Sequence, residues 1–414
     1  MTDLTLMGER ARAAARQLMT ADTAKKNAAL NNVAQRISRE REAVIGANAL
    51  DVAAGREAGL TEALIDRLTL DEKRIKGLAD SISDVMALPD PVGRVLNEQL
   101  RPNGLLIRKV AVPIGVLAVI YEARPNVTVD SAALSLKSGN AVILRGGREA
   151  IRTNTVLASL IREALQEAGL PADCVQLIED TSRESANALM HLNGFVDALI
   201  PRGGKGLIDS VVNSATVPVI ATGAGVCHAY VDEHADIAMA AEIILNGKAS
   251  RPAVCNSLEC MLIHKDIARK ALPPIKAALD TANVKIHGDG RVAAILPGVI
   301  PADDSDWGRE YGDYIIAAKV VDSEDEAIEH IARFSTGHSE VIITGDAAAA
   351  ERFMSRVDSA AVYLNASTRF TDGGEFGLGA EIGISTQKLH ARGPLGLNEL
   401  TSMKYMIYGK GQIR

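Results

Sequence analysis

The spacing of hydrophobic residues changes along the chain. Within the first ninety residues, apolar positions such as Leu30, Val33 and Ile37 recur every three or four residues among charged ones, which predicts amphipathic helices. From Ile114 onward, short apolar runs alternate with amphipathic stretches. The runs predict strands of a five-stranded, doubly wound parallel sheet at 114–120, 141–144, 175–178, 196–200 and 217–221. The stretches between them predict helices at about 128–138, 152–167, 183–192 and 205–214.

A second alternation of the same kind follows. It predicts a helix near 235–246, a strand at 258–264 and a helix at 265–279, with further strands and helices to about residue 364. Residues 100–112 and 401–414 alternate polar and apolar side chains, as edge strands do, and fit neither sheet. The predicted fold class is therefore α/β, with two doubly wound domains and a small additional β unit.

Composition and charge narrow the classes of function. The 414 residues are 47% hydrophobic, which is enough for two or three domains, each with its own core. A net charge of −7 without any basic run argues against nucleic acid or an anionic membrane as the main partner. Charged residues interrupt the first 25 positions, and no uncharged apolar run reaches the ~18 residues of a membrane span. We therefore expect a cytoplasmic protein that acts on small molecules.

Four cysteines are candidates for thiol chemistry, and we expect all of them to be reduced. Cys174 opens one apolar strand and Cys260 lies inside another, as is typical of buried packing residues. Cys227 follows the Gly-rich segment 223–225, whereas Cys255 lies in a loop with basic residues, where a thiol ionises more readily. From the residues alone, Cys227 and Cys255 both remain candidates.

Four features in sequence order resemble the aldehyde dehydrogenase family. A strand runs into Pro125-Asn126, a second strand lies within the segment 137–148, Thr222 precedes Cys255, and Glu310 lies upstream of a predicted helix start near 324. The resemblance implies that Cys255 is the nucleophile and that Glu310 holds the nicotinamide ribose. It also implies that the side-chain amide of Asn126 and the backbone N–H of Cys255 stabilise the oxyanion.

The resemblance also implies a dinucleotide cofactor. The strand end Arg145-Gly146-Gly147-Arg148 corresponds to the family's adenosine ribose site, where NAD-selective members carry an acid at the position of Arg148. An arginine there favours the 2′-phosphate of NADP. The chain lacks a G-x-G-x-x-G run, and the family's phosphate-binding turn corresponds to Gly203-Gly204. We therefore expect NADPH as the cofactor.

Thr222 replaces the glutamate that activates water in the hydrolytic members of the family. A threonine cannot act as a base near neutral pH, so water is not the expected acyl acceptor. Five stretches resemble the gamma-glutamyl phosphate reductases more closely still, namely 121–126, 223–228, 306–311, 330–340 and 391–401. This resemblance implies reduction of L-glutamyl 5-phosphate to L-glutamate 5-semialdehyde through a Cys255 thioester, the second step of proline biosynthesis from glutamate.

The resemblance further implies a division into domains. Residues 1–99 and 113–224 would bind NADP, residues 225–395 would carry the catalytic cysteine, and residues 100–112 and 396–414 would join subunits into a homodimer or a dimer of dimers. Alternative functions are a CoA-acylating aldehyde dehydrogenase, a thiol acyltransferase without redox chemistry, and a non-catalytic binding protein.

The phosphate, carboxylate and ammonium groups of the substrate require binding partners in the protein. The candidates that the sequence offers are Arg124, Lys137, His228, Arg251 and His338. We favour Arg251 for the phosphate, because it lies four residues from Cys255. We expect no metal ion in the site. Association with glutamate 5-kinase, which makes the labile substrate, is left open by the sequence.

Overall fold

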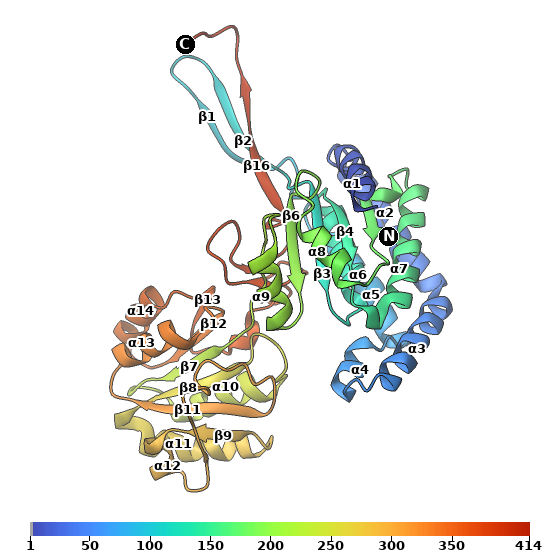
Figure 1. Ribbon diagram of the computed structural model, residues 1–414. Coiled ribbons are helices and arrows are strands. Elements are labelled where there is room, and N and C mark those ends of the chain that lie inside the picture. Colours follow the sequence, from blue (N-terminus) through green and yellow to red (C-terminus); the bar gives the residue numbers. More distant parts are fainter. Residues whose placement is uncertain (1–2) are drawn as a thin grey trace. The chain divides into compact units, whose positions relative to one another are not determined.

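The chain forms two compact units. The computed structural model describes residues 3–414 (Figure 1). The first unit comprises residues 3–222, 377–383 and 395–414, and the second comprises residues 223–376 and 384–394. The chain therefore passes between the units four times. No helix among the described residues is long and apolar enough to cross a bilayer.

A four-stranded parallel sheet forms the centre of the first unit, with the strand order β5-β4-β3-β6. Its strands are β3 (Val116–Tyr121), β4 (Ala141–Arg145), β5 (Val175–Leu177) and β6 (Ala198–Arg202). Each strand is followed by a helix: α6 (Asn126–Lys137), α7 (Ile151–Glu167), α8 (Arg183–Met190) and α9 (Lys205–Ser214). Short 3-10 turns lie at η1 (Arg148–Ala150) and η2 (Ala172–Cys174).

The predicted fifth strand at 217–221 does not form. Only a single bridge joins Val219 to Leu199 of β6. Pro218, the second residue of the segment, carries no N–H and cannot continue a ladder of hydrogen bonds. The segment is therefore attached to β6 by the backbone bonds Leu199 N to Pro218 O and Ile220 N to Leu199 O, at 2.8 and 2.9 Å.

The N-terminal helices belong to the same unit. They are α1 (Leu4–Leu18), α2 (Thr23–Arg39), α3 (Arg41–Glu57), α4 (Glu62–Leu68) and α5 (Glu72–Ala87). Leu30, Val33 and Ile37 are buried on α2, as their spacing predicted. The side chain of Asp22 begins this helix by accepting a hydrogen bond from the backbone N–H of Lys25.

The two predicted edge segments pair with each other in an antiparallel sheet of order β1-β2-β16. Its strands are β1 (Val95–Leu100), β2 (Leu106–Pro113) and β16 (Thr401–Tyr408). Residues 100–112 thus contain the end of β1, the turn and most of β2 rather than one strand. Figure 1 shows the β1–β2 hairpin and β16 side by side. Large apolar side chains on this sheet are exposed, including Leu100, Tyr405 and Ile407.

The second unit contains a parallel sheet of seven strands in the order β10-β9-β11-β8-β7-β12-β13. They are β7 (Cys227–Val231), β8 (Leu258–His264), β9 (Lys285–Gly288), β10 (Ile300–Pro301), β11 (Ile315–Val321), β12 (Ser339–Ile343) and β13 (Ala361–Leu364). Its helices are α10 (Ile237–Ala249), α11 (Lys265–Asp280), α12 (Gly290–Ile295), α13 (Glu324–Phe334) and α14 (Ala347–Arg356). A 3-10 turn, η3 (Thr368–Phe370), and the short strands β14 (Ile384–Ser385) and β15 (Gly393–Pro394) complete the unit.

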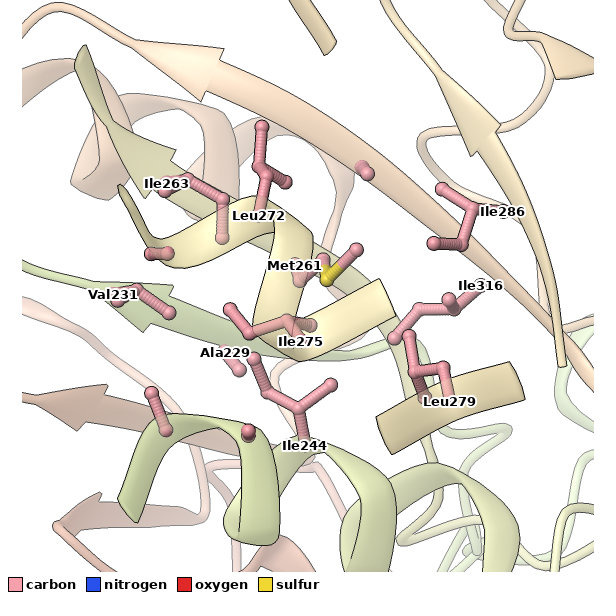
Figure 2. Packing of buried hydrophobic residues seen from close by; sticks show 14 of the residues in the cluster. Ala229, Val231, Ile244, Met261, Ile263, Leu272, Ile275, Leu279, Ile286 and Ile316 are labelled. Atoms are coloured by element: carbon pink, nitrogen blue, oxygen red, sulfur yellow. The ribbon is translucent and has the colours of Figure 1, made fainter. Parts of the chain in front are cut away.

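An aliphatic core fills one face of the second sheet. Figure 2 shows Leu272, Ile275 and Leu279 of α11 and Ile244 of α10 against side chains of β7, β8, β9 and β11. Aliphatic side chains fill this core at close packing, in agreement with the low share of aromatic residues in the chain, which is 3%. The core fixes β7 beside β8, with Cys227 opposite Leu258. The loops that precede these two parallel strands therefore end at the same edge of the sheet.

Candidate active site

Cys255 lies three residues before β8, in the loop that follows α10. It is partly exposed, whereas Cys174, Cys227 and Cys260 are buried. Burial raises the pKa of the Cys174 thiol to about 12 and the pKa of the Cys227 thiol well above its ordinary value. Those two thiols therefore stay protonated near neutral pH. Exposure thus singles out Cys255 as the thiol that can meet a substrate.

Cys227 supports the backbone of the nucleophile's loop. Its thiol donates a hydrogen bond to the carbonyl oxygen of Cys255 at 3.3 Å. Gly225 faces the same carbonyl so closely that a Cβ at this position would lie 1.4 Å from the oxygen. Only glycine fits there. The segment before β7 therefore shapes the Cys255 loop by packing against it, a role that the sequence did not reveal.

A buried ion pair spans the two ends of the Cys255 loop. Lys248 Nζ of α10 lies 2.7 Å from Glu259 Oε2 of β8, and both side chains are almost fully buried. Burial lowers the pKa of Lys248, which the charge of Glu259 partly offsets. Burial likewise raises the pKa of Glu259 to about 7, against the effect of Lys248. This pair could not be predicted from the sequence, because its members meet only when α10 packs beside β8.

Glu310 lies in the same unit as Cys255. Its Oε1 accepts a hydrogen bond from the backbone N–H of Gly225 at 3.1 Å, and the residue is exposed. The following residues approach the buried ion pair, since the backbone N–H of Gly312 donates to Glu259 Oε1 at 3.4 Å. Glu310 is thereby held beside the glycine segment that packs on the nucleophile's backbone.

Asn126 lies in the first unit, at the first position of α6 directly after the Pro125 turn. Its Nδ2 donates a hydrogen bond to Asp130 Oδ2 one turn later, at 3.0 Å. An amide nitrogen carries two hydrogens, so this bond fixes the orientation of the side chain while leaving a second donor. Thr222, in the same unit, donates through Oγ1 to the carbonyl of Pro201 at 2.7 Å and is buried.

The predicted cofactor residues follow two strands of the first sheet. Arg145 ends β4, and its Nη2 donates to the carbonyl oxygens of Thr181 and Ser182 at 2.7 and 2.8 Å. Burial lowers the pKa of Arg145. The side chain of Arg148 is 79% exposed and lies 3.5 Å from the carboxylate of Glu149, so it can reach a ligand. Between the two arginines, a Cβ at Gly146 would clash with the side chains of Asn154 and Tyr121.

Gly203 and Gly204 connect β6 to α9, with Gly204 at the N-cap of the helix. The backbone N–H of Gly204 donates to Glu122 Oε2 at 3.0 Å, so this helix start already holds a carboxylate. The N-terminus of a helix attracts anions through its free N–H groups and its dipole. Because both turns follow the carboxyl ends of parallel strands, they lie at the edge where α/β sheets bind nucleotides.

Three of the five substrate candidates are buried within their own units. Lys137 Nζ donates to Asn27 Oδ1 and the carbonyl of Met86 at 2.7 and 2.8 Å. His228 lies at 0% exposure with its Nδ1 3.4 Å from Glu340 Oε2. Burial by itself lowers the pKa of His228, but Cys260 and Glu340 raise it to about 10. His338 is also at 0% exposure. We therefore do not retain these three residues in the substrate site, whereas Arg124 and Arg251 are exposed.

Two groups of side chains among the described residues could hold a cation. His228, Cys260 and His330 form a buried group, and Glu233, His264 and Asp266 form a more exposed one. Neither group includes Cys255.

Arg369 of η3 is another neighbour of the nucleophile's loop that the sequence did not predict. It donates through Nε to Ser250 Oγ at 3.1 Å.

The buried imidazole of His338 makes stability depend on pH. Burial lowers its pKa from 6.5 to about 4, so the unfolded chain takes up this proton at higher pH than the folded chain. The contribution to stability is therefore complete above pH 6.5 and is lost as the pH falls toward 4, by about 1.4 kcal/mol per pH unit. We expect His338→Gln to make the decline of the unfolding midpoint between pH 6.5 and 4 shallower. The matched change His191→Gln, at an exposed histidine, should leave the decline as it is, and an unchanged decline in His338→Gln would contradict the assignment.

Comparison with known proteins identifies the family to which the chain belongs. The sequence profile of the aldehyde dehydrogenase family matches residues 2–294. A gamma-glutamyl phosphate reductase of Clostridium novyi (strain NT) is 56% identical over 404 residues, which cover 98% of this chain and 97% of the relative. The chain belongs to the gamma-glutamyl phosphate reductase family. Its place within the aldehyde dehydrogenases confirms the resemblance that the sequence motifs indicated.

Solved structures support the gamma-glutamyl phosphate reductase family and its fold. The crystal structure of a gamma-glutamyl phosphate reductase from Thermotoga maritima is 47% identical, with a TM-score of 0.98 and full coverage of both chains. An acetylating aldehyde dehydrogenase from Geobacillus thermoglucosidasius shares the fold at 17% identity, with a TM-score of 0.71. The predicted aldehyde dehydrogenase-like α/β fold is thus confirmed.

Proposed function

We propose that the chain reduces L-glutamyl 5-phosphate to L-glutamate 5-semialdehyde, with NADPH as the reductant and release of phosphate. This reaction is the second step of proline biosynthesis from glutamate. The observation that carries the proposal is the single partly exposed cysteine, Cys255, in a chain that is 56% identical to a gamma-glutamyl phosphate reductase.

Cys255 would act as the nucleophile. Its thiolate attacks the carbonyl carbon of the acyl phosphate, a C–S bond forms, and the C–O bond to phosphate breaks with its electron pair leaving on the phosphate. The resulting thioester accepts a hydride at its carbonyl carbon. The C–S bond of the thiohemiacetal then breaks, which releases the aldehyde and restores the thiolate.

Asn126 and the backbone N–H of Cys255 are proposed to donate hydrogen bonds to the oxyanion at each tetrahedral stage. The bond from Asn126 to Asp130 supports this role, because it orients the amide before substrate arrives. Donors that are already oriented stabilise the transition state without a cost of rearrangement.

Arg148 and the Gly203-Gly204 turn are proposed to hold the phosphates of NADPH, with Arg145 and Glu310 at the two riboses. When bound, the cofactor supplies the hydride. The exposed guanidinium of Arg148 suits the 2′-phosphate of NADP, and the start of α9, which holds the carboxylate of Glu122, suits another anion. These two observations support the proposed fit of the residues to the cofactor.

Thr222 supports reduction over hydrolysis. Its hydroxyl is buried and donates to a backbone carbonyl, so it offers no base to activate water. A thioester on Cys255 would therefore persist long enough to be reduced.

The proposal is tested in the reverse direction, by supplying the semialdehyde with NADP and either inorganic phosphate or CoA. We expect NADPH to form only with phosphate. Turnover only with CoA would favour a CoA-acylating aldehyde dehydrogenase, and phosphate-independent formation of free glutamate would favour a hydrolytic enzyme. NADPH binding without any turnover would favour a binding protein, and acyl transfer without NADPH binding would favour a thiol acyltransferase.

The sheet β1-β2-β16 is proposed to join subunits into a homodimer or a dimer of dimers. Its exposed side chains support this role, because Leu100, Tyr405 and Ile407 are 73%, 62% and 60% accessible and would be buried by a partner. We expect Ile407→Glu to convert the oligomer into monomers in size-exclusion chromatography with light scattering. Ile413→Glu, at an apolar residue beyond β16 that is also exposed, is the matched control. Equal masses for wild type and Ile407→Glu would contradict the proposal.

We also propose a cytoplasmic location, which is supported by four cysteines in the reduced thiol form and the requirement for NADPH. Because acyl phosphates are labile, transient association with glutamate 5-kinase is proposed as well. Chemical cross-linking of the two purified enzymes during turnover tests it.

A further inference from the structure

Arg369 reaches the nucleophile's loop from a distant part of the sequence. It lies in η3, after β13, yet its Nε donates to Ser250 Oγ at 3.1 Å and its Nη1 donates to Asn256 Oδ1. Asn256 is the residue directly after Cys255. Among residues 3–414, Arg369 forms no ion pair and its Nη2 donates no hydrogen bond. The guanidinium therefore brings an uncompensated positive charge to the residue beside the nucleophile.

The position of Arg369 is fixed by reciprocal hydrogen bonds with Asn256. The amide nitrogen of Asn256 donates to the carbonyl oxygens of Arg369 and Thr371 at 3.3 and 2.9 Å. Thr368 Oγ1 donates in turn to the backbone carbonyl of Asn256 at 2.7 Å. These bonds link both the backbone and the side chain of Arg369 to the Cys255 loop, so the guanidinium is oriented before any ligand binds.

A second guanidinium lies close to the first. Burial is the largest of the effects that lower the pKa of Arg369, and the positive charge of Arg251 lowers this pKa further. Asp372 and the thiols of Cys255 and Cys227 act in the opposite direction. Arg251 itself is exposed, and within the described part of the chain it makes no hydrogen bond or ion pair. Two like charges that repel each other are stabilised when an anion binds to both.

We propose that Arg369, with Arg251, binds the phosphate group of the acyl phosphate substrate. This inference rests on the proposed function and names the residues that recognise the leaving group. The phosphorus atom is two bonds from the carbonyl carbon that Cys255 attacks, whereas the α-carboxylate carbon of a glutamyl chain is four bonds away. A cation held on the residue next to the nucleophile is therefore better placed for the phosphate. As the C–O bond breaks, the two guanidinium groups neutralise the charge that collects on the departing phosphate.

The test varies inorganic phosphate in the reverse reaction, with semialdehyde and NADP held constant. We expect Arg369→Gln to raise the KM for phosphate at least about tenfold, because charged hydrogen bonds are lost, while the KM for semialdehyde stays within about twofold. Arg369→Lys should recover part of the loss, since it keeps the charge but not the fork of donors. Arg269→Gln, at an exposed arginine of α11 in the same unit, is the control and should change neither constant.

Other outcomes would overturn the assignment. A raised KM for semialdehyde with an unchanged KM for phosphate would place the α-carboxylate at Arg369 instead. A fall in kcat alone would mean that Arg369 only supports the loop through Ser250 and Asn256.

A second readout needs no turnover and so separates this inference from the proposed function. Inorganic phosphate should slow the alkylation of Cys255 by iodoacetamide in the wild type but not in Arg369→Gln. Equal protection of the two proteins, or protection of neither, would overturn the phosphate site even if the wild type were inactive in the reverse assay. Protection of the wild type alone, combined with no phosphate-dependent turnover, would retain the anion site and reject the proposed reaction.

Discussion

Replacing Cys255 with alanine is expected to reduce phosphate-dependent formation of NADPH by about 10⁴-fold or more, because the covalent route is lost altogether. The side chain is partly exposed and lies in a loop outside the aliphatic core, so the unfolding midpoint should change little. NADPH binding, followed by fluorescence titration, should also be retained. The wild type incubated with acyl phosphate in the absence of NADPH should gain the mass of an acyl group on Cys255, whereas the variant should not.

Cys174→Ala provides the matched control, because Cys174 is buried in the first unit and is not expected to take part in the reaction. Its turnover should stay within a few-fold of the wild type. Substantial activity in Cys255→Ala, or acylation that appears on another cysteine, would show that the nucleophile has been assigned to the wrong residue.

Replacing Lys248 with methionine is expected to have the largest effect on stability. The change leaves Glu259 buried without its counter-charge, and loss of one partner of a buried pair costs about 3–5 kcal/mol. The carboxyl group, whose pKa is already raised to about 7, would then be raised further. A carboxyl with a raised pKa in the folded state stabilises the fold at low pH and loses that contribution as the pH rises. The destabilisation should therefore be greater at pH 8.5 than at pH 6, measured by urea unfolding.

The double variant Lys248→Met with Glu259→Gln should recover part of this loss, because it removes the unpaired charge. Lys276→Met is the matched control. Lys276 forms an exposed pair with Asp280 on α11, and such pairs contribute less than about 1 kcal/mol. A Lys248→Met variant no less stable than this control, or one without pH dependence, would contradict the role of the ion pair.

Much of the fold could be predicted from the spacing of apolar residues. Strand β8 was predicted at its observed bounds, and the helices of the first sheet were predicted to within about two residues. Those elements have continuous apolar runs or a clear helical face. The segment 217–221 has the same apolar character, but Pro218 lacks the backbone N–H that a strand ladder needs, so the predicted strand does not form. β7 was missed because His228, a polar residue, interrupts its short apolar pattern, although the side chain is buried in the structure.

The sequence predicted only those residues of the candidate site that belong to a short recognisable motif. Cys255, Asn126 and Glu310 each belong to a short recognisable stretch. Lys137, His228 and His338 also belong to such stretches, yet their side chains are buried, and sequence alone does not distinguish a buried motif residue from one that meets a ligand. Arg369 was missed because its partner Asn256 is 113 residues away. A single arginine before a glycine-rich segment is the only signal that the sequence offered.

The order of β1, β2 and β16 bears on how the chain is synthesised. β2 is the central strand of that sheet, but one of its two partners is β16 (Thr401–Tyr408). At roughly 5–20 residues per second, the ribosome needs about 15–60 seconds to pass from the end of β2 to the start of β16. During that interval one edge of β2 has no partner and can pair with another nascent chain. The first unit is therefore completed only after β16 has been synthesised, and a protein truncated before β16 would be prone to aggregate.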